Sequence, residues 1–125
     1  MAANFAPWVR ALDLTITEIS ADRAVMAMPN TPDLARIGGI VSGQALSALA
    51  DTAMVFAGLA GAQEIRPIAT TNLDVQFLRP GVGDQIICTA HVVRRGKALI
   101  FTAAEMVAQP LNKPVATATA TFFVP

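Results

Sequence analysis

The sequence has few charged residues and few reactive side chains. Of its 125 residues only 14% are charged, the formal net charge is zero, and there are one cysteine, one histidine and no tyrosine. A balanced charge provides no electrostatic attraction to nucleic acid or to an anionic membrane, so neither is expected as a partner. No Cys, His or Asp cluster has metal-ligand spacing, so we expect no metal site.

Several common motifs are also missing. Gly38, Gly39 and Gly43 match neither a phosphate-binding loop nor a dinucleotide fingerprint, because no strand–glycine–helix–strand unit surrounds them. No apolar run reaches the roughly eighteen residues of a membrane-spanning helix without a polar interruption, and residues 1–5 lack the basic and apolar regions of a signal peptide. The single Cys88 lies in an apolar, strand-like run and is expected to be a buried small hydrophobe. Together these features predict a cytoplasmic protein.

Apolar residues, in contrast, are abundant and make up 54% of the chain. The length predicts a single domain over residues 1–125, large enough for a real core. This composition is too apolar for a small, fully solvated monomer. We therefore expect part of the surface to be covered by self-association, as a homodimer or homotetramer.

The stretch from Gly38 to Gly61 predicts a central helix. It is glycine-rich at its start and then dominated by Ala and Leu, which favour helix formation. Ser42 is expected to cap the start of the helix, and Gly58 with Gly61 to end it. Because the helix is apolar nearly all round, most of its surface should be buried.

Asp51 is the only ionisable residue between Ile37 and Gln63, and it lies in mid-helix. Burying an unpaired carboxylate costs roughly several kcal/mol or raises its pKa. Asp51 either reaches solvent or a neighbouring hydroxyl such as that of Ser47 or Thr52, or it is a base or nucleophile in a dry site. The glycine-rich turn favours the second interpretation, because a helix N-terminus offers free N–H groups to an oxyanion.

The rest of the chain predicts mainly strands. Alternating residues at 12–17 and 23–28 indicate an antiparallel hairpin. Residues 5–9 are expected to form a lead-in whose aromatic residues pack on the body, and residues 33–36 one helical turn. Four further runs, separated by turn signals, predict an antiparallel meander: 68–78, 85–94, 98–108 and 115–124.

A hairpin, one buried helix and a long meander give an α+β architecture. An all-apolar helix needs more than a flat sheet to cover it, so we expect a strongly curved antiparallel sheet wrapped round it, the hot-dog fold. This arrangement leaves edge strands that pairing between subunits can bury.

Three segments together resemble the hot-dog acyl-CoA thioesterases of the phenylacetate-degradation (PaaI-like) type. They are Leu-Ala-Asp-Thr-Ala at 49–53, the segment 70–80 ending in Phe-Leu-Arg-Pro, and Arg-Gly-Lys at 95–97. The resemblance spans roughly residues 12–124. It implies hydrolysis of an acyl-CoA thioester by homodimers, often paired into tetramers, without metal or redox cofactor. It assigns the nucleophile or general base to Asp51 and the oxyanion N–H to Gly43.

The start of the helix departs from this family. Many members have His-Gly-Gly there, whereas this chain has Ser42, Gly43 and Gln44. A side chain at Gln44 would narrow the acyl pocket or hydrogen-bond the thioester, which affects the substrate class more than the reaction type. Ser42, Gln44, Thr52 and Asn72 are expected to contact the substrate.

Basic residues are the candidates for binding the CoA phosphates. By the resemblance, the cluster at 94–97 could meet those phosphates, and the alternative is a solvated turn; Arg79, held before Pro80, has a similar claim. The candidates are Arg79, Arg94, Arg95 and Lys97.

His91 lies in a strand and is expected to be a core or surface residue. This placement argues against a hot-dog dehydratase or hydratase and against a Ser-His-Asp triad.

Two other functions stay open from the sequence: a hot-dog protein that binds acyl-CoA or an acyl ligand without turning it over, and a structural or partner-binding subunit.

If the chain is a thioesterase, Gly43 and Asp51 cannot act together within one chain. They are eight residues apart, or about 12 Å along a helix. We therefore expect each site to combine Asp51 of one subunit with Gly43 of its partner.

Overall fold

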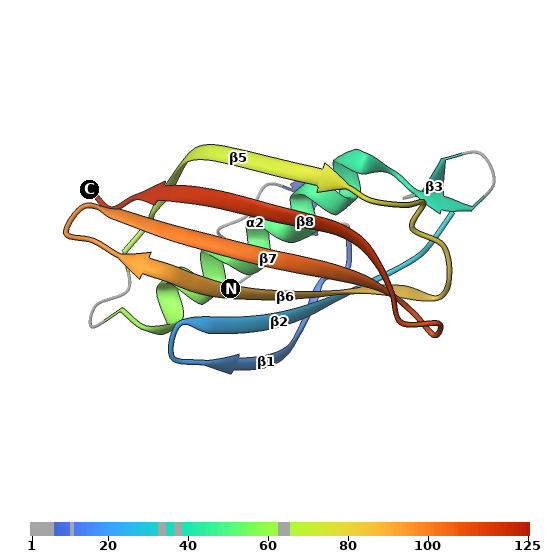
Figure 1. The fold of residues 1–125 in the computed structure, drawn as a ribbon, viewed down its shortest axis with the longest axis horizontal. Helices are drawn as coiled ribbons and strands as arrows, with labels where there is room; N and C mark the ends of the chain where they lie inside the picture. Colours follow the sequence, from blue (N-terminus) through green and yellow to red (C-terminus); the bar gives the residue numbers. More distant parts are fainter. Residues whose placement is uncertain (1–6, 11, 33–34, 37–38, 63–65) are drawn as a thin grey trace.

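The structure is a computed structural model that describes residues 7–10, 12–32, 35–36, 39–62 and 66–125. A six-stranded antiparallel sheet lies along the helix α2 (Gly43–Ala60), as Figure 1 shows. This confirms the expected α+β architecture. The strands of the sheet are β1 (Thr15–Ser20), β2 (Arg23–Pro29), β5 (Ala69–Phe77), β6 (Gln85–Arg95), β7 (Leu99–Gln109) and β8 (Lys113–Phe123).

The order of the strands differs in one respect from the expected meander. The order is β1-β2-β6-β7-β8-β5, so the first hairpin and the consecutive strands β6 to β8 are confirmed. The predicted position of β5 is wrong, because it pairs with β8 at the far edge of the sheet instead of with β6. The segment 78–84 crosses the end of the sheet to reach β6. It is held there by the Leu78 N–H, which donates to the Val115 carbonyl (2.8 Å), and by the Asp84 N–H, which donates to the Gln109 carbonyl (2.8 Å).

The start of α2 is capped as expected. The Ala45 N–H donates to Ser42 Oγ over 3.2 Å, which satisfies one of the free N–H groups of the first turn. The expected end of the helix is only partly right. The helix continues through Gly58 and stops at Ala60, with Gly61 as its C-cap. One interior glycine costs about 1 kcal/mol of helix propensity, and Gly58 is buried in the last turns, where packing offsets that cost.

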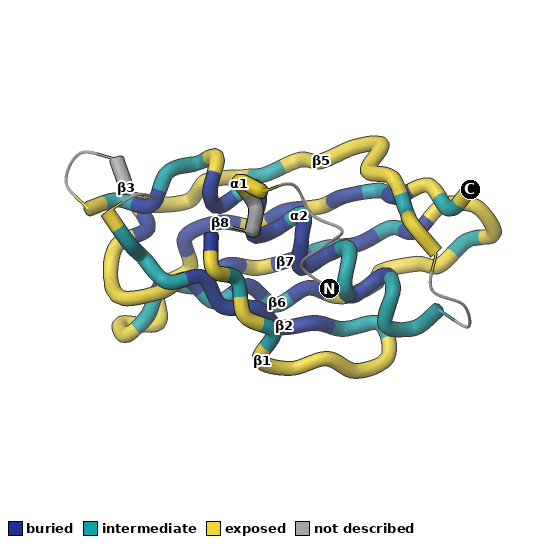
Figure 2. Tube along the Cα trace, turned by 180° about the vertical axis from the view of Figure 1, so that it is seen from behind, coloured by how far each residue is buried: buried dark blue, intermediate teal, exposed yellow. Residues whose placement is uncertain are grey.

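The core lies between the sheet and one face of α2, where the residues are dark blue in Figure 2. Small residues such as Ala24, Ala90 and Ala104 on the sheet let the helix approach closely, and methionines fill the remaining space. Cys88 is fully buried, and burial raises the pKa of its thiol to about 12. It therefore acts as a small hydrophobe, as predicted.

The opposite face of α2 is not covered by the sheet. Gln44 is exposed, while Ser47, Asp51 and Val55 are half-buried. The expectation that the helix is buried nearly all round therefore holds for the sheet side alone, within one subunit. By length and mean hydropathy α2 is apolar enough to cross a membrane, a test that the core helix of a soluble protein also passes.

The shorter elements correct two further expectations. Ala35 and Arg36 form the strand β3 (Ala35–Arg36), which pairs with β4 (Ile40–Val41), so this part of the predicted helical turn is wrong. Residues 33–34 lie outside the described residues, as does Phe5. Trp8 lies in the short helix α1 (Pro7–Arg10) and is 59% exposed, so the expected packing of this aromatic residue on the body is only partial.

Candidate active site

The Asp51 carboxylate is held by a residue from a different element. Thr70, near the start of β5, donates its hydroxyl to Asp51 Oδ1 over 3.0 Å. The two hydroxyls expected from the sequence are not its partners, since Thr52 donates to the Ala48 carbonyl (2.7 Å) and no such bond joins Ser47 to Asp51 among the described residues. Burial raises the pKa of Asp51, and the hydrogen bond from Thr70 partly counters this. A half-buried carboxylate with a raised pKa is suited to act as a base.

The role of Thr70 could not be predicted from the sequence, because the orientation of its side chain depends on an irregularity in β5. Asp74 and Gln76 pair with Thr119 and Thr117 on the outer face of the sheet, and simple alternation would place Thr70 with them. The register shifts between Thr70 and Asn72, and Thr70 instead lies opposite the buried Phe122. Such a bulge turns the side chain toward the helix.

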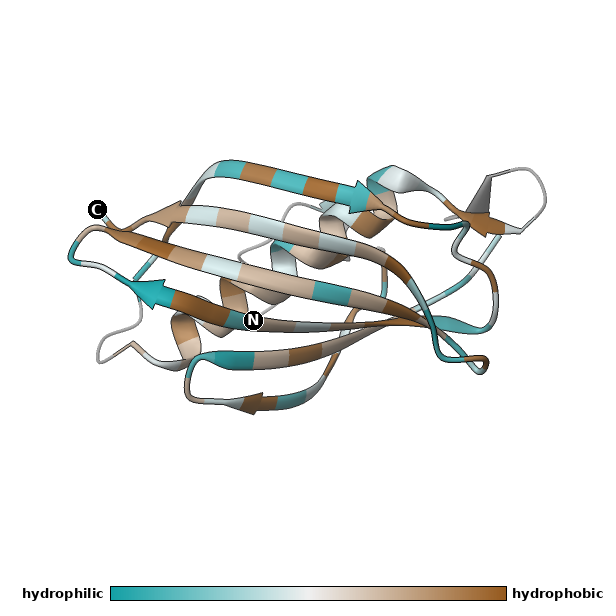
Figure 3. Cartoon of the chain, viewed as in Figure 1, coloured by the Kyte–Doolittle hydropathy of each residue, from teal (hydrophilic) through white to brown (hydrophobic). Residues whose placement is uncertain are grey.

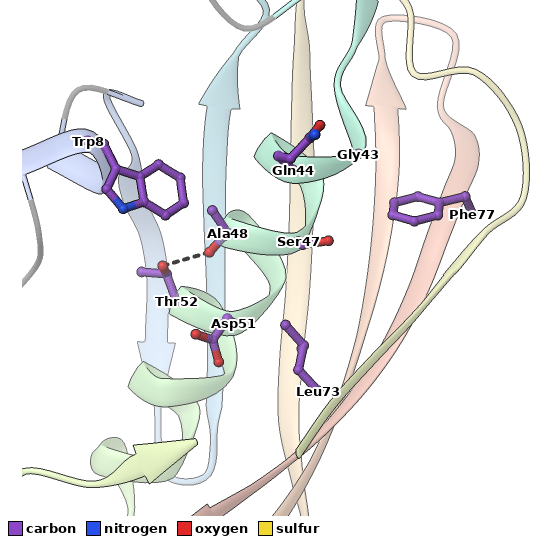
Figure 4. Close-up of a pocket in the computed structure, with 9 residues that line it drawn as sticks. All are labelled: Trp8, Gly43, Gln44, Ser47, Ala48, Asp51, Thr52, Leu73 and Phe77. Carbon is purple, nitrogen blue, oxygen red and sulfur yellow. Dashed lines mark hydrogen bonds between the residues drawn. The ribbon is translucent and has the colours of Figure 1, made fainter. Parts of the chain in front are cut away.

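Asp51 lies in a cavity of about 680 Å³ beside the uncovered face of α2. Figure 4 shows Trp8 on one side of the helix and Leu73 with Phe77 on the other, while Gln44, Ser47 and Asp51 lie between them. The side walls are aromatic and aliphatic, and polar atoms come mainly from the helix. This combination is typical of a site for a mostly apolar small molecule.

Gly43 lies at the start of α2 and also lines this cavity. Its N–H belongs to the first turn, where backbone donors have no partner within the helix. A Cβ at this position would lie 3.3 Å from Phe77 Cζ, so the ring packs directly against the glycine backbone. Gly43 and Asp51 are about 12 Å apart along the axis, so one subunit does not bring them to the same reacting atom.

The other substrate-contact candidates are distributed differently. Gln44 and Thr52 line the cavity, although the Thr52 hydroxyl already donates to the Ala48 carbonyl. The Ser42 hydroxyl serves as the helix cap. Asn72 is paired with Thr121 on the outer face of the sheet, away from the helix, so it does not line this cavity.

The basic candidates do not gather near Gly43 within one subunit. Arg95 forms an ion pair with Asp22 (2.5 Å), close to Gly61 at the far end of α2. Arg94 lies opposite Phe101 on the outer face, and Lys97 is in the turn between β6 and β7. Only Arg79 lies near the start of the helix, where it lines an adjoining cavity. His91 is exposed on the outer face of β6, which agrees with a surface histidine.

One helix on an antiparallel sheet in this order defines a hot-dog protein, and solved structures confirm the fold. The E. coli PaaI protein from the phenylacetic acid degradation operon superposes with a TM-score of 0.86 and 27% identity, over 98% of this chain and 87% of that chain. A phenylacetic acid degradation-related protein from Ralstonia eutropha superposes with a TM-score of 0.85 and 28% identity, over 96% of this chain and 92% of that chain. A thioesterase family protein from Silicibacter pomeroyi has a TM-score of 0.87 and 26% identity, over 94% of this chain and 88% of that chain.

The family itself follows from the sequence match. Residues 30–123 match the acyl-CoA thioesterase N-terminal domain family. The chain belongs to this family and is a thioester hydrolase, which confirms the resemblance drawn from its motifs. A search of curated protein sequences gave no match.

Proposed function

We propose that this protein hydrolyses an acyl-CoA thioester to the free acid and CoA in a site shared by two subunits. Asp51 of one subunit is the base or nucleophile, and the Gly43 N–H at the start of the partner's helix stabilises the oxyanion. The observation that carries the proposal is the half-buried Asp51 carboxylate, held by Thr70 in an apolar cavity that Gly43 also lines.

The pairing of subunits is supported by the edge strand β5. Among the described residues no strand pairs with its outer edge, and nearly all of its residues are exposed. Figure 3 shows β5 alternating between hydrophilic and hydrophobic residues; Leu73, Val75 and Phe77 are on the helix face and Asp74 and Gln76 on the outer face. An edge strand of this kind is a template for pairing with a second chain. In the proposed dimer β5 pairs antiparallel with its copy, in a register that brings the start of each helix alongside the middle of the other.

The reaction needs an acceptor for one proton and a donor to one oxyanion. In one route the Asp51 carboxylate accepts a proton from water as the water oxygen attacks the thioester carbonyl carbon. In the other, the carboxylate attacks the carbonyl itself and water hydrolyses the resulting anhydride. In both routes the carbonyl oxygen becomes an oxyanion that accepts the Gly43 N–H, the C–S bond breaks, and the departing CoA thiolate takes up a proton.

The acyl group is expected to be apolar. Trp8, Leu73 and Phe77 line the cavity, and two relatives are named for phenylacetic acid degradation. Arylacetyl and aliphatic acyl groups both fit such walls. We propose Gln44 as a contact to the thioester or the acyl group, because it is exposed and lines the cavity.

The proposal is tested by measuring free-thiol release from a panel of arylacetyl- and aliphatic acyl-CoAs. We expect turnover of at least one class, and a fall in kcat of about two orders of magnitude or more in Asp51→Asn. Ser47→Ala, which changes a polar residue on the same helix face, is the matched control and should keep most of the activity. If no acyl-CoA is cleaved, or if Asp51→Asn is fully active, the proposed mechanism is wrong.

A further inference from the structure

The active-site cavity has a neighbour on the other side of one aromatic ring. A second cavity of about 420 Å³ lies between the start of α2, β4 and the segment after β5. The two cavities share Gly43 and Phe77 among their lining residues. The partition between them is therefore the place where the Phe77 ring meets the Gly43 backbone.

The Phe77 ring is well placed to form this partition. Phe77 is the last residue of β5 and lies opposite the small, buried Ala116, so its side chain is on the helix face of the sheet. Its ring reaches to van der Waals distance of Gly43, because a Cβ there would be 3.3 Å from Phe77 Cζ. Figure 4 shows the ring directed at the first turn of α2. Yet 55% of the residue is exposed, so the neighbouring side chains do not enclose it.

The walls of the second cavity suit hydrocarbon. Four of the nine residues that line it are aliphatic, and Arg79 is the charged one among them. An acyl chain that passed the Phe77 ring would find further apolar surface there, whereas the ring in its present position blocks that path. The aliphatic residues are Ile40, Val41, Leu46 and Leu78.

We infer that Phe77 is a specificity-determining residue: its ring closes the end of the acyl cavity and excludes acyl chains long enough to enter the second cavity. This inference rests on the proposed function. Removal of the ring joins the two cavities and extends the accepted acyl length, and Gly43 keeps its N–H. An extra methylene group in an apolar pocket is worth about tenfold or more in kcat/KM. An acyl chain that buries several more methylene groups in the variant should therefore show a measurable increase in kcat/KM.

The experiment compares kcat/KM for butanoyl-, octanoyl- and dodecanoyl-CoA between the wild type and Phe77→Ala. We expect the dodecanoyl-to-butanoyl ratio to rise about tenfold or more in the variant. Leu73→Ala is the matched control. Leu73 is on the same face of β5 as Phe77, but it lines the active-site cavity and not the second cavity. It should change the ratio much less. Phe77→Leu, which keeps an apolar group on Gly43, provides the same test if the alanine variant does not fold.

The outcomes separate this inference from the proposed function. If the wild type cleaves neither these three substrates nor an arylacetyl-CoA, the proposed function fails, and the inference fails with it. If the wild type cleaves only arylacetyl-CoA and Phe77→Ala gains no activity on the three aliphatic substrates, the inference alone is overturned. If the wild type is active but Phe77→Ala leaves the ratio unchanged, changes all three substrates equally, or shifts the ratio no more than Leu73→Ala, the inference alone is overturned. An equal change for all chain lengths would mean that Phe77 contacts the shared CoA moiety instead of the acyl chain.

Discussion

The Thr70 hydroxyl on β5 donates a hydrogen bond to Asp51 Oδ1 on α2, with 3.0 Å between the two oxygens. This bond joins the edge strand of the sheet to the uncovered face of the helix. It fixes one carboxylate oxygen, and no described residue donates a side-chain hydrogen bond to the other. It also lowers the pKa of Asp51 against the larger effect of burial, which raises it. Thr70 is therefore a positioning residue for the proposed base.

Replacing Thr70 by Val should change the pH dependence of the reaction. Val keeps the shape of Thr but cannot donate, so the pKa of Asp51 should rise further, and the acid limb of the kcat/KM profile should move to higher pH. Thr70→Ser retains the hydroxyl donor, so the acid limb of its kcat/KM profile should lie at the same pH as that of the wild type. The measurement is the pH–rate profile of the three proteins. If Val and Ser give the same profile, the hydrogen bond has no influence on the base.

Replacing Asp51 by Asn should stabilise the fold at neutral pH. Because the folded-state pKa of Asp51 is raised above its ordinary value of 3.8, its charged form is disfavoured in the folded protein. Asp51 therefore reduces stability at all pH values above the folded pKa, and this effect disappears as the pH falls below 3.8. The asparagine side chain of the variant is neutral at every pH, and its amide oxygen can still accept from Thr70.

Thermal unfolding of the wild type and Asp51→Asn over a pH series tests whether the charged Asp51 side chain destabilises the fold. We expect the melting temperature of the variant to be higher at pH 7 and the difference to shrink toward acid pH. Asp74→Asn, a change of the same charge on the exposed outer face of β5, is the control and should show little difference. A variant less stable than the wild type at pH 7 would contradict the argument.

Two glycines near the end of α2 should respond in opposite ways to Ala. Gly58 is helical, and an added Cβ would lie 3.6 Å from Ile68 and 3.7 Å from Ile100, which are ordinary contacts. Gly58→Ala should therefore gain helix propensity of about 1 kcal/mol, which raises the melting temperature by about 4 °C. At Gly61 the added Cβ would overlap the Asp22 carboxylate that pairs with Arg95.

We expect Gly61→Ala to lower the melting temperature because it displaces Asp22 and breaks that ion pair. Differential scanning calorimetry of both variants provides the comparison. A stable Gly61→Ala protein, or a destabilised Gly58→Ala protein, would mean that the packing around this helix end differs from the structure.

Much of the fold could be predicted from the sequence because its signals are local. The alternation in residues 12–28 gives the hairpin, and the Ser42 cap follows from the residue types at the start of an Ala- and Leu-rich run. The place of β5 could not be read in the same way. Pairing with β8 instead of β6 depends on long-range contacts of the segment 78–84, and strand periodicity carries no information about neighbours.

The candidate site shows the same division. Asp51 is identified by its chemistry, since a lone carboxylate in an apolar helix needs an explanation. Thr70 and Phe77 depend on three-dimensional placement: the first on a register shift in β5, the second on contact with Gly43. Trp8 is expected from the sequence to pack on the body, but its place at the cavity depends on where the short helix α1 lies.

The basic residues at the end of β6 and in the turn that follows it are predicted to affect CoA binding and not the chemical step. If Arg94 and Lys97 contact CoA phosphates, replacing each with Ala should raise KM in a salt-dependent way and leave kcat nearly unchanged. Arg95→Ala should also lose its ion pair with Asp22, an exposed interaction worth about 0–1 kcal/mol. Lys113→Ala, an exposed cation at the opposite end of the sheet, is the control. If all variants show the wild-type KM, the cluster is a solvated turn.

The shared site makes a prediction about mixtures of two inactive proteins. Asp51→Asn removes the base, and Gly43→Pro removes the N–H at the first helical position, where proline is tolerated. In a heterodimer of the two, one site combines an intact Asp51 with an intact Gly43, and the other site carries both changes. Random reassortment makes about half of the dimers heterodimers, so about a quarter of the wild-type activity should return. Gly43→Ala, which keeps the N–H, should be active alone and controls for the added carbon near Phe77. If native mass spectrometry shows heterodimers and no activity returns, the two residues do not act across the subunit interface.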